Sequence, residues 1–407
     1  MSSGDEATGP AICIVAAVGL AYLVVILVQL PGASRRGDFS IYYGCAVAMQ
    51  RGLDPYAIDL RNFTRALGFE PDPFVHPADT PTFTVVTMPI AMISPPVAYA
   101  MWFSAEVSCL IASLYLLFGA LNNRFAILLS LGALGFTPLA DNFRWAQSQI
   151  FVLLGILIFF RLMQRGRDGM AGMVLAMLGL LRGFPLVLGG YLIARQKRRA
   201  VVALALAFAL GAAATVAAIG AAPAMNFLRV LGIIGGRQWF SLDPRWELAA
   251  ANVSLDAFVA RALMLLNLKL AARTTILALK LPLLAATFSL TTVRKASDEG
   301  ALSLWIVTML ILTPVVWLHY LVVLLIPFGF IALGGRELRL APYAYCIIVM
   351  ITPLMSTLTF RGGAPALAQL GFLSLLFAWF ATWRFASDSC AASEGAARYP
   401  APLRSWP

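Results

Sequence analysis

The sequence predicts an all-α polytopic membrane protein, and three observations support this fold class. The chain has 407 residues, of which 60% are hydrophobic and 12% are charged, whereas soluble domains carry about 25% charged residues. Apolar segments of helical length recur from one end to the other, without the short alternating strands of a membrane β-barrel. The net charge of +11 comes from basic clusters between these segments, which is typical of cytoplasmic loops and does not point to nucleic acid.

We expect about twelve transmembrane helices in a single transmembrane domain at residues 11–386. The flanking tails at residues 1–10 and 387–407 are polar, and the second is expected to be disordered. Residues 11–31 are expected to form an uncleaved anchor, because the segment before them is acidic and no small-residue cleavage site follows. The distribution of basic residues places both termini in the cytoplasm.

Two larger loops are expected on the external side, at residues 32–80 and 222–272. The first holds six carboxylates, and its segment Asp38–Gln50 is expected to form a helix along the membrane surface, with Asp38 at the N-cap. Residues 82–93 are too short to cross a bilayer and predict a re-entrant or interfacial piece.

Residues 170–194 lie between two basic loops, so both of their ends should be cytoplasmic. This stretch is too short for two spans of about 20 residues each. Two short helices that meet near Arg182–Pro185 would resolve the conflict, and such breaks are tolerated where they line a cavity. The segment 301–333 repeats this short hairpin, with Trp317–Tyr320 at its apex. The remaining expected spans are residues 97–120, 125–140, 150–163, 200–221, 273–293, 340–359 and 364–386.

The residue inventory argues against several classes of site. Five scattered cysteines and two histidines offer no metal-ligand spacing and no disulfide framework, so no metal is expected. There is no Walker loop, no GxGxxG after a strand and no GxSxG. Nucleotide-driven pumps, dehydrogenases and hydrolases are therefore disfavoured, and no cofactor is expected.

Three residues stand out as chemical candidates. Asp38 follows the first apolar segment, where a carboxylate can accept a proton from a hydroxyl, although a plain helix N-cap is the simpler interpretation. Arg182 lies in an otherwise apolar stretch, and such a charge either binds a phosphate or pairs with a carboxylate such as Glu106. His319 at a hairpin apex could donate a hydrogen bond to a phosphate or sugar, and a structural role for it is equally favoured.

Several short motifs, taken together in their order, resemble glycosyltransferase family 87. The first is Gly37-Asp38-Phe39-Ser40-Ile41-Tyr42-Tyr43, with Gly52-Leu53-Asp54-Pro55-Tyr56 behind it. Trp145–Gln149 resembles the family's Gly-Gln-x-Asn element, with Ala146 and Gln149 as departures. Leu181–Pro185 resembles its Lys-x-x-Pro element, with Arg182 in place of Lys. Asn252–Leu255 with Arg261 resembles its Asn-x-Ser segment, and Thr313–Tyr320 resembles its Ser-Pro-x-x-Trp-x-His-Tyr element.

The resemblance implies a polytopic enzyme of the GT-C fold that takes mannose or a related sugar from a polyprenyl phosphate. It implies that Asp38 is the general base of an inverting displacement and that His319 lies at the active site. The charge of the leaving phosphate would then be met by Arg182 and His319, with Arg245 or Arg261. The further candidates for binding substrate or phosphate are Tyr42, Tyr43, Arg144, Gln147, Gln149, Asn252 and Trp317.

The function expected from this resemblance is the transfer of a hexose from a polyprenyl-phosphate donor to a hydroxyl of a lipid or glycan acceptor. The expected location is the bacterial inner membrane, with the active site on the external, periplasmic side. Two alternatives stay open, namely a transporter or flippase of lipid-linked sugars and an inactive scaffold of a glycan assembly complex. A transporter should show a repeat between its halves, and the sequence contains no convincing one.

Overall fold

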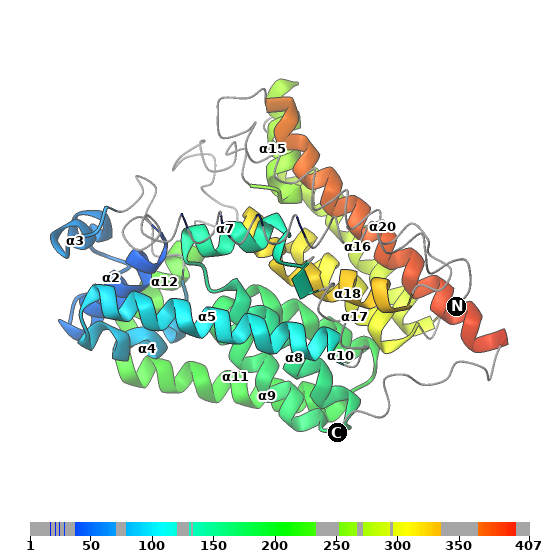
Figure 1. The fold of residues 1–407 in the computed structure, drawn as a ribbon, viewed down its shortest axis with the longest axis horizontal. Helices are drawn as coiled ribbons and strands as arrows, with labels where there is room; N and C mark the ends of the chain where they lie inside the picture. Colours follow the sequence, from blue (N-terminus) through cyan, green and yellow to red (C-terminus); the bar gives the residue numbers. More distant parts are fainter. Residues whose placement is uncertain are drawn as a thin grey trace. The chain divides into compact units, whose positions relative to one another are not determined.

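The computed structural model describes most of the chain, and all regular elements in the described ranges are helices (Figure 1). The described residues are 37–70, 79–119, 130–131, 133–232, 252–266, 272–293, 296–334 and 365–395, with single residues at 17, 21, 24 and 28. The all-helical prediction is confirmed for these ranges. Arg245, the expected span at residues 340–359 and nearly all of the expected anchor at residues 11–31 lie outside them.

The chain divides into two compact units, so the stretch that the sequence analysis expects to be one transmembrane domain is shared between them. Unit I comprises Ile26–Ile111 and Asp141–Pro244. Unit II comprises Met1–Val25, Ala112–Ala140 and Arg245–Pro407. Each unit therefore combines segments that are far apart in the sequence.

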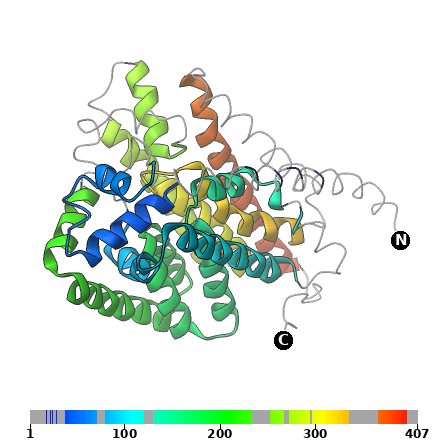
Figure 2. The same cartoon turned by 60° about the vertical axis from the view of Figure 1, so that its left-hand side comes forward.

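Unit I contains helices from two separate parts of the chain. Its elements are α2 (Phe39–Gln50), α3 (Leu60–Ala66), α4 (Pro81–Thr87), η1 (Met88–Met92), the first part of α5 (Pro95–Phe118), the end of α7 (Thr137–Trp145), α8 (Gln149–Gln164), α9 (Asp168–Arg182), η2 (Phe184–Leu188), α10 (Gly189–Ala194), α11 (Arg198–Ile219) and α12 (Ala221–Gly232). Helix α9 packs against both α8 and α11 (Figures 1 and 2).

Helix α2 is buried on every side rather than on a single face. All residues from Phe39 to Ala48 are buried, because α3, α4 and η1 pack around the helix. Aromatic rings fill the space beside it, with Tyr42 lying 4.9 Å from Phe83 and 5.2 Å from Trp102 between ring centroids. The predicted helix is present, and this packing holds its first turn firmly in place.

The predicted break in residues 170–194 is confirmed. Helix α9 ends at Arg182, and Gly183 follows with φ +69°, a positive φ that glycine adopts without a steric penalty. The chain then continues through the short η2 helix, which contains Pro185, into α10. Because of this break, Arg182 lies at the carboxyl end of α9 in unit I.

Unit II contains α15 (Leu255–Leu265), α16 (Ala272–Val293), α17 (Asp298–Leu312), η5 (Leu318–Leu324), α18 (Leu325–Gly334) and α20 (Pro365–Gly395). Helix α17 is its centre, since every residue from Gly300 to Ile311 is buried. The hydroxyls of Thr287 and Thr308 lie 2.8 Å apart, and the indole N–H of Trp379 points to both, which joins α16, α17 and α20 through polar contacts. Helix α20 continues past residue 387, where the polar tail was expected, as far as Gly395.

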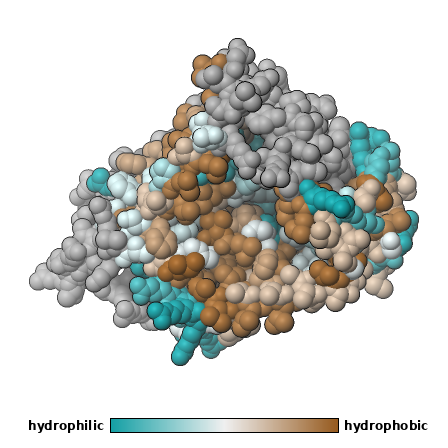
Figure 3. Space-filling model, turned by 180° about the vertical axis from the view of Figure 1, so that it is seen from behind, coloured by the Kyte–Doolittle hydropathy of each residue, from teal (hydrophilic) through white to brown (hydrophobic). Residues whose placement is uncertain are grey.

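Three of the described helices are long and apolar enough to cross a membrane: Pro95–Phe118, Arg198–Ile219 and Thr274–Thr292. The count of about twelve spans stays a prediction. Side chains on one stripe of α11 are strongly exposed, namely Val202 at 57%, Leu206 at 60% and Leu210 at 71%. Hydrophobic residues likewise cover much of the face seen in Figure 3. Lipid is the natural neighbour of such a surface.

The contact between α9 and α11 depends on Gly172. A Cβ atom built on Gly172 would lie 2.2 Å from the carbonyl oxygen of Ala200 and 2.9 Å from the backbone N of Leu204. Because backbone atoms cannot move aside as a side chain can, we expect Gly172→Ala to destabilise the protein by about 1–3 kcal/mol, which thermal unfolding in detergent would measure.

Gly169→Ala is the matched control, because a Cβ there meets nothing within 4 Å on the same helix. It should leave the melting temperature unchanged or raise it, since alanine favours the helix. Equal melting temperatures for the two variants would show that the helices do not meet at Gly172.

Candidate active site

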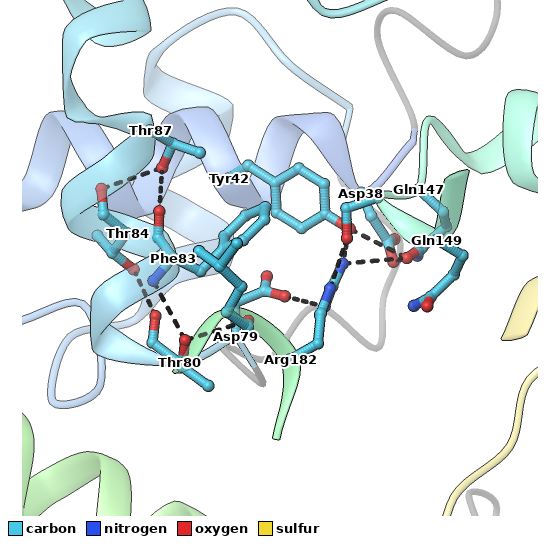
Figure 4. A network of polar contacts seen from close by, with 12 residues as sticks. Asp38, Tyr42, Asp79, Thr80, Phe83, Thr84, Thr87, Gln147, Gln149 and Arg182 are labelled. Atoms are coloured by element: carbon cyan, nitrogen blue, oxygen red, sulfur yellow. Dashed lines mark hydrogen bonds and ion pairs between the residues drawn. The ribbon is translucent and has the colours of Figure 1, made fainter. Parts of the chain in front are cut away.

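Asp38 occupies the N-cap position of α2 without using its side chain as a cap. The helix begins at Phe39, and no capping hydrogen bond comes from the Asp38 carboxylate. Its Oδ2 instead accepts a hydrogen bond from the side-chain amide of Gln147 (Figure 4). The backbone N–H of Asp38 donates to the carbonyl of Trp145 at 2.7 Å. The N-cap interpretation is therefore right about the position of Asp38 and wrong about its side chain.

Gln147 is placed by a turn that closes helix α7. The N–H of Ala146 donates to the carbonyl of Phe143 at 3.2 Å, and the N–H of Gln147 donates to that of Asn142 at 2.9 Å. Together these bonds form the pattern of a Schellman motif, whose C′ residue takes a left-handed conformation. Ala146 occupies that position with φ +51°. The motif that Trp145–Gln149 resembles has glycine at this position, and glycine adopts such a conformation without strain.

Arg182 is surrounded by partners. Its Nη1 makes an ion pair with the carboxylate of Asp79, and the two side chains are only 9% and 7% exposed. Its Nη2 donates to the Tyr42 hydroxyl at 2.6 Å, and its Nε donates to the Ser148 hydroxyl. The guanidinium carbon also lies 5.0 Å from the ring centroid of Phe83. The charge at depth is thus paired, as buried charges must be.

The partner of Arg182 differs from the one suggested by the sequence. Glu106 does not pair with it; its Oε1 accepts a hydrogen bond from the Asn142 side chain at 2.8 Å. Asp79 takes that place, and the sequence contained no signal that singled it out among the carboxylates of residues 32–80. The Thr80 hydroxyl donates to the carbonyls of Leu180 and Leu181, which brings Asp79 to the end of α9.

These contacts form a continuous polar chain in unit I. It runs from Asp79 to Arg182, then to Tyr42, whose hydroxyl lies 3.0 Å from Gln147 Oε1, and from Gln147 to Asp38 (Figure 4). Burial raises the pKa of Tyr42 well above its usual value, so its hydroxyl stays protonated. Burial also raises the pKa of Asp79, and the Arg182 guanidinium opposes that effect. Three of the candidates, Tyr42, Gln147 and Arg182, thus meet Asp38 in one network.

Three other candidates of unit I lie around this network. Gln149 is fully buried, and neither polar atom of its side-chain amide has a hydrogen-bond partner among the described residues. The hydroxyl of Tyr43 donates to the carbonyl of Ile93 at 2.8 Å, away from Asp38. Arg144 is exposed, and its guanidinium lies 5.6 Å from the ring of Trp145. Of these, Gln149 is the one with buried donors and acceptors still available to a ligand.

A second cluster, in unit II, joins Asn252 to the segment of His319. The Asn252 Oδ1 accepts from the N–H of Val316 and of Ser254, each at 3.2 Å, and a β-bridge pairs Asn252 with Trp317. The Arg261 Nη1 donates to the Asn252 carbonyl at 3.0 Å. Burial lowers the pKa of Arg261 to about 10, so it remains cationic at neutral pH.

His319 itself is buried in η5 and lies 5.2 Å from the ring of Tyr320. Asn252, Arg261, Trp317 and His319 are therefore gathered in unit II, while Arg245 lies outside the described residues. In the described part of the chain, no group of three or more His, Cys, Asp or Glu side chains is arranged to hold a metal ion.

Lys280 is a polar feature of unit II that the sequence analysis missed. It lies within the apolar helix α16, makes an ion pair with Asp256 and donates to the carbonyl of Leu312 at 3.0 Å. This contact ties α15 and α16 to the end of α17, directly before the segment that leads to His319. A lysine inside an apolar span is itself a signal of such a role, and it was available in the sequence.

Comparison with known protein families matches residues 79–316 to glycosyltransferase family 87. Searches of curated proteins and of solved structures found no match. The matched range contains Asp79, Gln147 and Arg182 of unit I and Asn252 and Arg261 of unit II. It begins after Asp38 and ends before His319.

The left-handed Ala146 gives a prediction about the placement of Gln147. We expect Ala146→Gly to change stability by less than about 1 kcal/mol, because relief of the left-handed strain offsets the lost methyl burial and the added chain entropy. Ala146→Val should destabilise by more than about 2 kcal/mol, since a β-branched residue fits this conformation poorly. Thermal unfolding of both variants in detergent measures these changes. A valine variant as stable as wild type would contradict the left-handed conformation of Ala146.

Proposed function

The chain belongs to glycosyltransferase family 87, and on this premise we propose that it transfers a hexose, mannose or a related sugar, from a polyprenyl-phosphate donor to a hydroxyl of a lipid or glycan acceptor. Membership of the family and the apolar helices make it a membrane glycosyltransferase. The choice of donor and acceptor is our proposal.

The observation that carries the mechanism is the Asp38 carboxylate, which is turned away from capping α2 and toward Gln147. In the proposed step, Asp38 accepts the proton of the acceptor hydroxyl while that oxygen attacks the anomeric carbon of the donor sugar. The bond between this carbon and the phosphate oxygen breaks, polyprenyl phosphate leaves, and the configuration at the anomeric carbon inverts. The hydrogen bond from the Gln147 amide limits the rotation of the Asp38 carboxylate, which keeps that carboxylate oriented to accept the proton.

The leaving phosphate needs cationic or hydrogen-bonding groups aimed at its developing charge. The family resemblance implies this role for His319 with Arg261 or Arg245, and we propose it on that basis. Arg182 is expected from the sequence to share it, but each of its three nitrogens already has a protein partner, Asp79, Tyr42 or Ser148. Its ion pair therefore favours an orienting role in this site. Gln149, Asn252 and Trp317 are kept as candidates for contacts with the sugar.

The proposed location is the bacterial inner membrane, with the Asp38 site external and both termini cytoplasmic. Support comes from helix α9, whose amino end lies among basic turns and whose carboxyl end carries Arg182. The turn Arg165–Arg167 precedes α9, and Lys197 of the next basic turn lies 3.5 Å from Asp168 at the same end. A helix of 15 residues is about 22 Å long. The positive-inside rule then puts the basic end in the cytoplasm and the polar network toward the other side.

A transporter or flippase of lipid-linked sugars is the second candidate, favoured by the broken α9–η2–α10 segment beside a buried arginine. Reconstituted vesicles loaded with polyprenyl-phosphate mannose separate the two functions. Formation of new glycosidic bonds identifies a transferase, whereas translocation of the lipid without such bonds identifies a transporter.

Replacement of the base tests the transferase mechanism. We expect Asp38→Asn to lower the transfer of labelled mannose from polyprenyl-phosphate mannose to endogenous membrane acceptors by at least about 100-fold, because a general base contributes about 10²–10⁴ in rate. The shape of the side chain is kept, so the variant should insert and fold.

Asp59→Asn is its control. It removes a carboxylate from the same segment, where Asp59 caps α3 by accepting from the N–H of Asn62, and asparagine caps a helix equally well. Its activity should stay within about twofold of wild type. Full activity in a correctly inserted Asp38→Asn variant would remove Asp38 from the mechanism, and a normal phenotype in cells would favour the inactive scaffold.

A further inference from the structure

In the hydrogen bonds around Gln147, Arg182 fixes which atom donates and which atom accepts. An arginine side chain can only donate hydrogen bonds. Because Arg182 Nη2 donates to the Tyr42 oxygen, the Tyr42 hydroxyl hydrogen is left to point at Gln147 Oε1. Arg182 Nη2 also lies 3.5 Å from the same Oε1. The amide oxygen of Gln147 must then face Tyr42, and its N–H must face the Asp38 carboxylate.

The opposite orientation of the amide would have a chemical consequence. A flipped Gln147 would present its oxygen to the carboxylate of Asp38 and its NH2 group to two donors. Both contacts are repulsive, so Asp38 would lose the partner that holds it. An amide alone cannot choose between its two orientations, and the choice is made by the donors behind it.

Asp79 is the group that holds those donors in place. Its carboxylate neutralises the buried Arg182 guanidinium, and its backbone carbonyl accepts from the Tyr56 hydroxyl at 2.9 Å. The neighbouring Thr80 hydroxyl bonds to two carbonyls at the end of α9. Asp79 is therefore anchored on both sides, and the position of Arg182 depends on it.

We infer that Asp79 is a positioning residue for the proposed transfer reaction: through Arg182 and Tyr42 it sets the orientation in which the Gln147 amide holds the Asp38 carboxylate. This inference rests on the proposed function, since it assigns Asp79 a role in orienting the proposed base. The Asp79 carboxylate pairs with Arg182 and reaches Asp38 only through Arg182, Tyr42 and Gln147. Its loss should therefore act on the chemical step and leave donor binding largely intact.

A double-mutant cycle tests the inference in native membranes, with labelled polyprenyl-phosphate mannose as donor and the membrane's own lipids as acceptors. The variants are Asp79→Asn, Tyr42→Phe and the two combined. Each single change should lower kcat at least tenfold and leave the donor KM within about threefold. If Asp79 acts through Tyr42, the combined variant should be no more than about threefold slower than the slower single variant. An Asp79→Asn kcat equal to wild type, or single effects that multiply, would overturn the inference.

Tyr99→Phe is the control for loss of a tyrosine hydroxyl. Tyr99 packs beside Phe39, and its hydroxyl has no hydrogen-bond partner among the described residues. Its kcat and its melting temperature should match those of wild type. A fall in kcat comparable to that of Tyr42→Phe would show that any tyrosine hydroxyl near α2 matters. It would overturn the inference that the hydrogen bonds from Arg182 through Tyr42 to Gln147 carry the effect.

The measurements distinguish a variant that fails to fold, a wrong proposed function and a wrong role for Asp79. Asp79→Asn leaves a buried guanidinium without its counter-charge, which is strongly destabilising. If that variant does not fold, Tyr42→Phe carries the test, because it keeps the ion pair and the ring packing against Phe83, and an unchanged kcat overturns the inference. Absence of transfer by wild type, or full activity of Asp38→Asn, would instead refute the proposed function. An active wild type and an inactive Asp38→Asn, with an Asp79→Asn of normal kcat, would refute the inference alone.

Discussion

The buried ion pair between Asp79 and Arg182 is the interaction on which the arrangement of unit I depends. A guanidinium away from water must have an opposite charge and a partner for each donor, or the fold loses several kcal/mol. Satisfying Arg182 draws the loop before α4, the helix α2 and the turn before α8 to one point at the end of α9. The same requirement that stabilises the unit therefore assembles the residues around Asp38.

The two units use the same physical solution in different ways. In unit I, a helix is broken at Gly183, and the end of α9 supplies the buried cation. In unit II, the helix α16 stays continuous and carries its cation in the middle, where Lys280 pairs with Asp256 and bonds to the end of α17. Arg182 is linked to Asp38 through Tyr42 and Gln147, whereas the half-buried Lys280 bonds to the end of the helix that precedes the His319 segment. Polar groups in an apolar setting are costly, so they recur where geometry has to be maintained.

Several features were predictable because they depend on local chemistry. The broken helix followed from two basic loops and a stretch too short for two spans, and Gly183 lies at the break. A helix after Asp38 followed from its capping position, and all-helical structure followed from composition. The polar network was only partly foreseen: Tyr42, Gln147 and Arg182 were named as candidates, whereas Asp79 and Lys280 were not. Lys280 could have been found from its place in an apolar span, but Asp79 was one of several carboxylates in a polar loop.

The sequence by itself determined that this is a helical membrane protein, that Arg182 must either bind a phosphate or pair with a carboxylate, and which short motifs carry the family resemblance. Hydropathy, charge and residue spacing are properties of the chain alone, so they can be read without a structure. Only the tertiary structure decided that Asp79 rather than Glu106 pairs with Arg182, and that the Asp38 carboxylate contacts Gln147 rather than capping α2. The partners in these contacts are about a hundred residues apart in the chain. Which of several equivalent groups meets a buried charge depends on helix packing, and no local pattern contains that information.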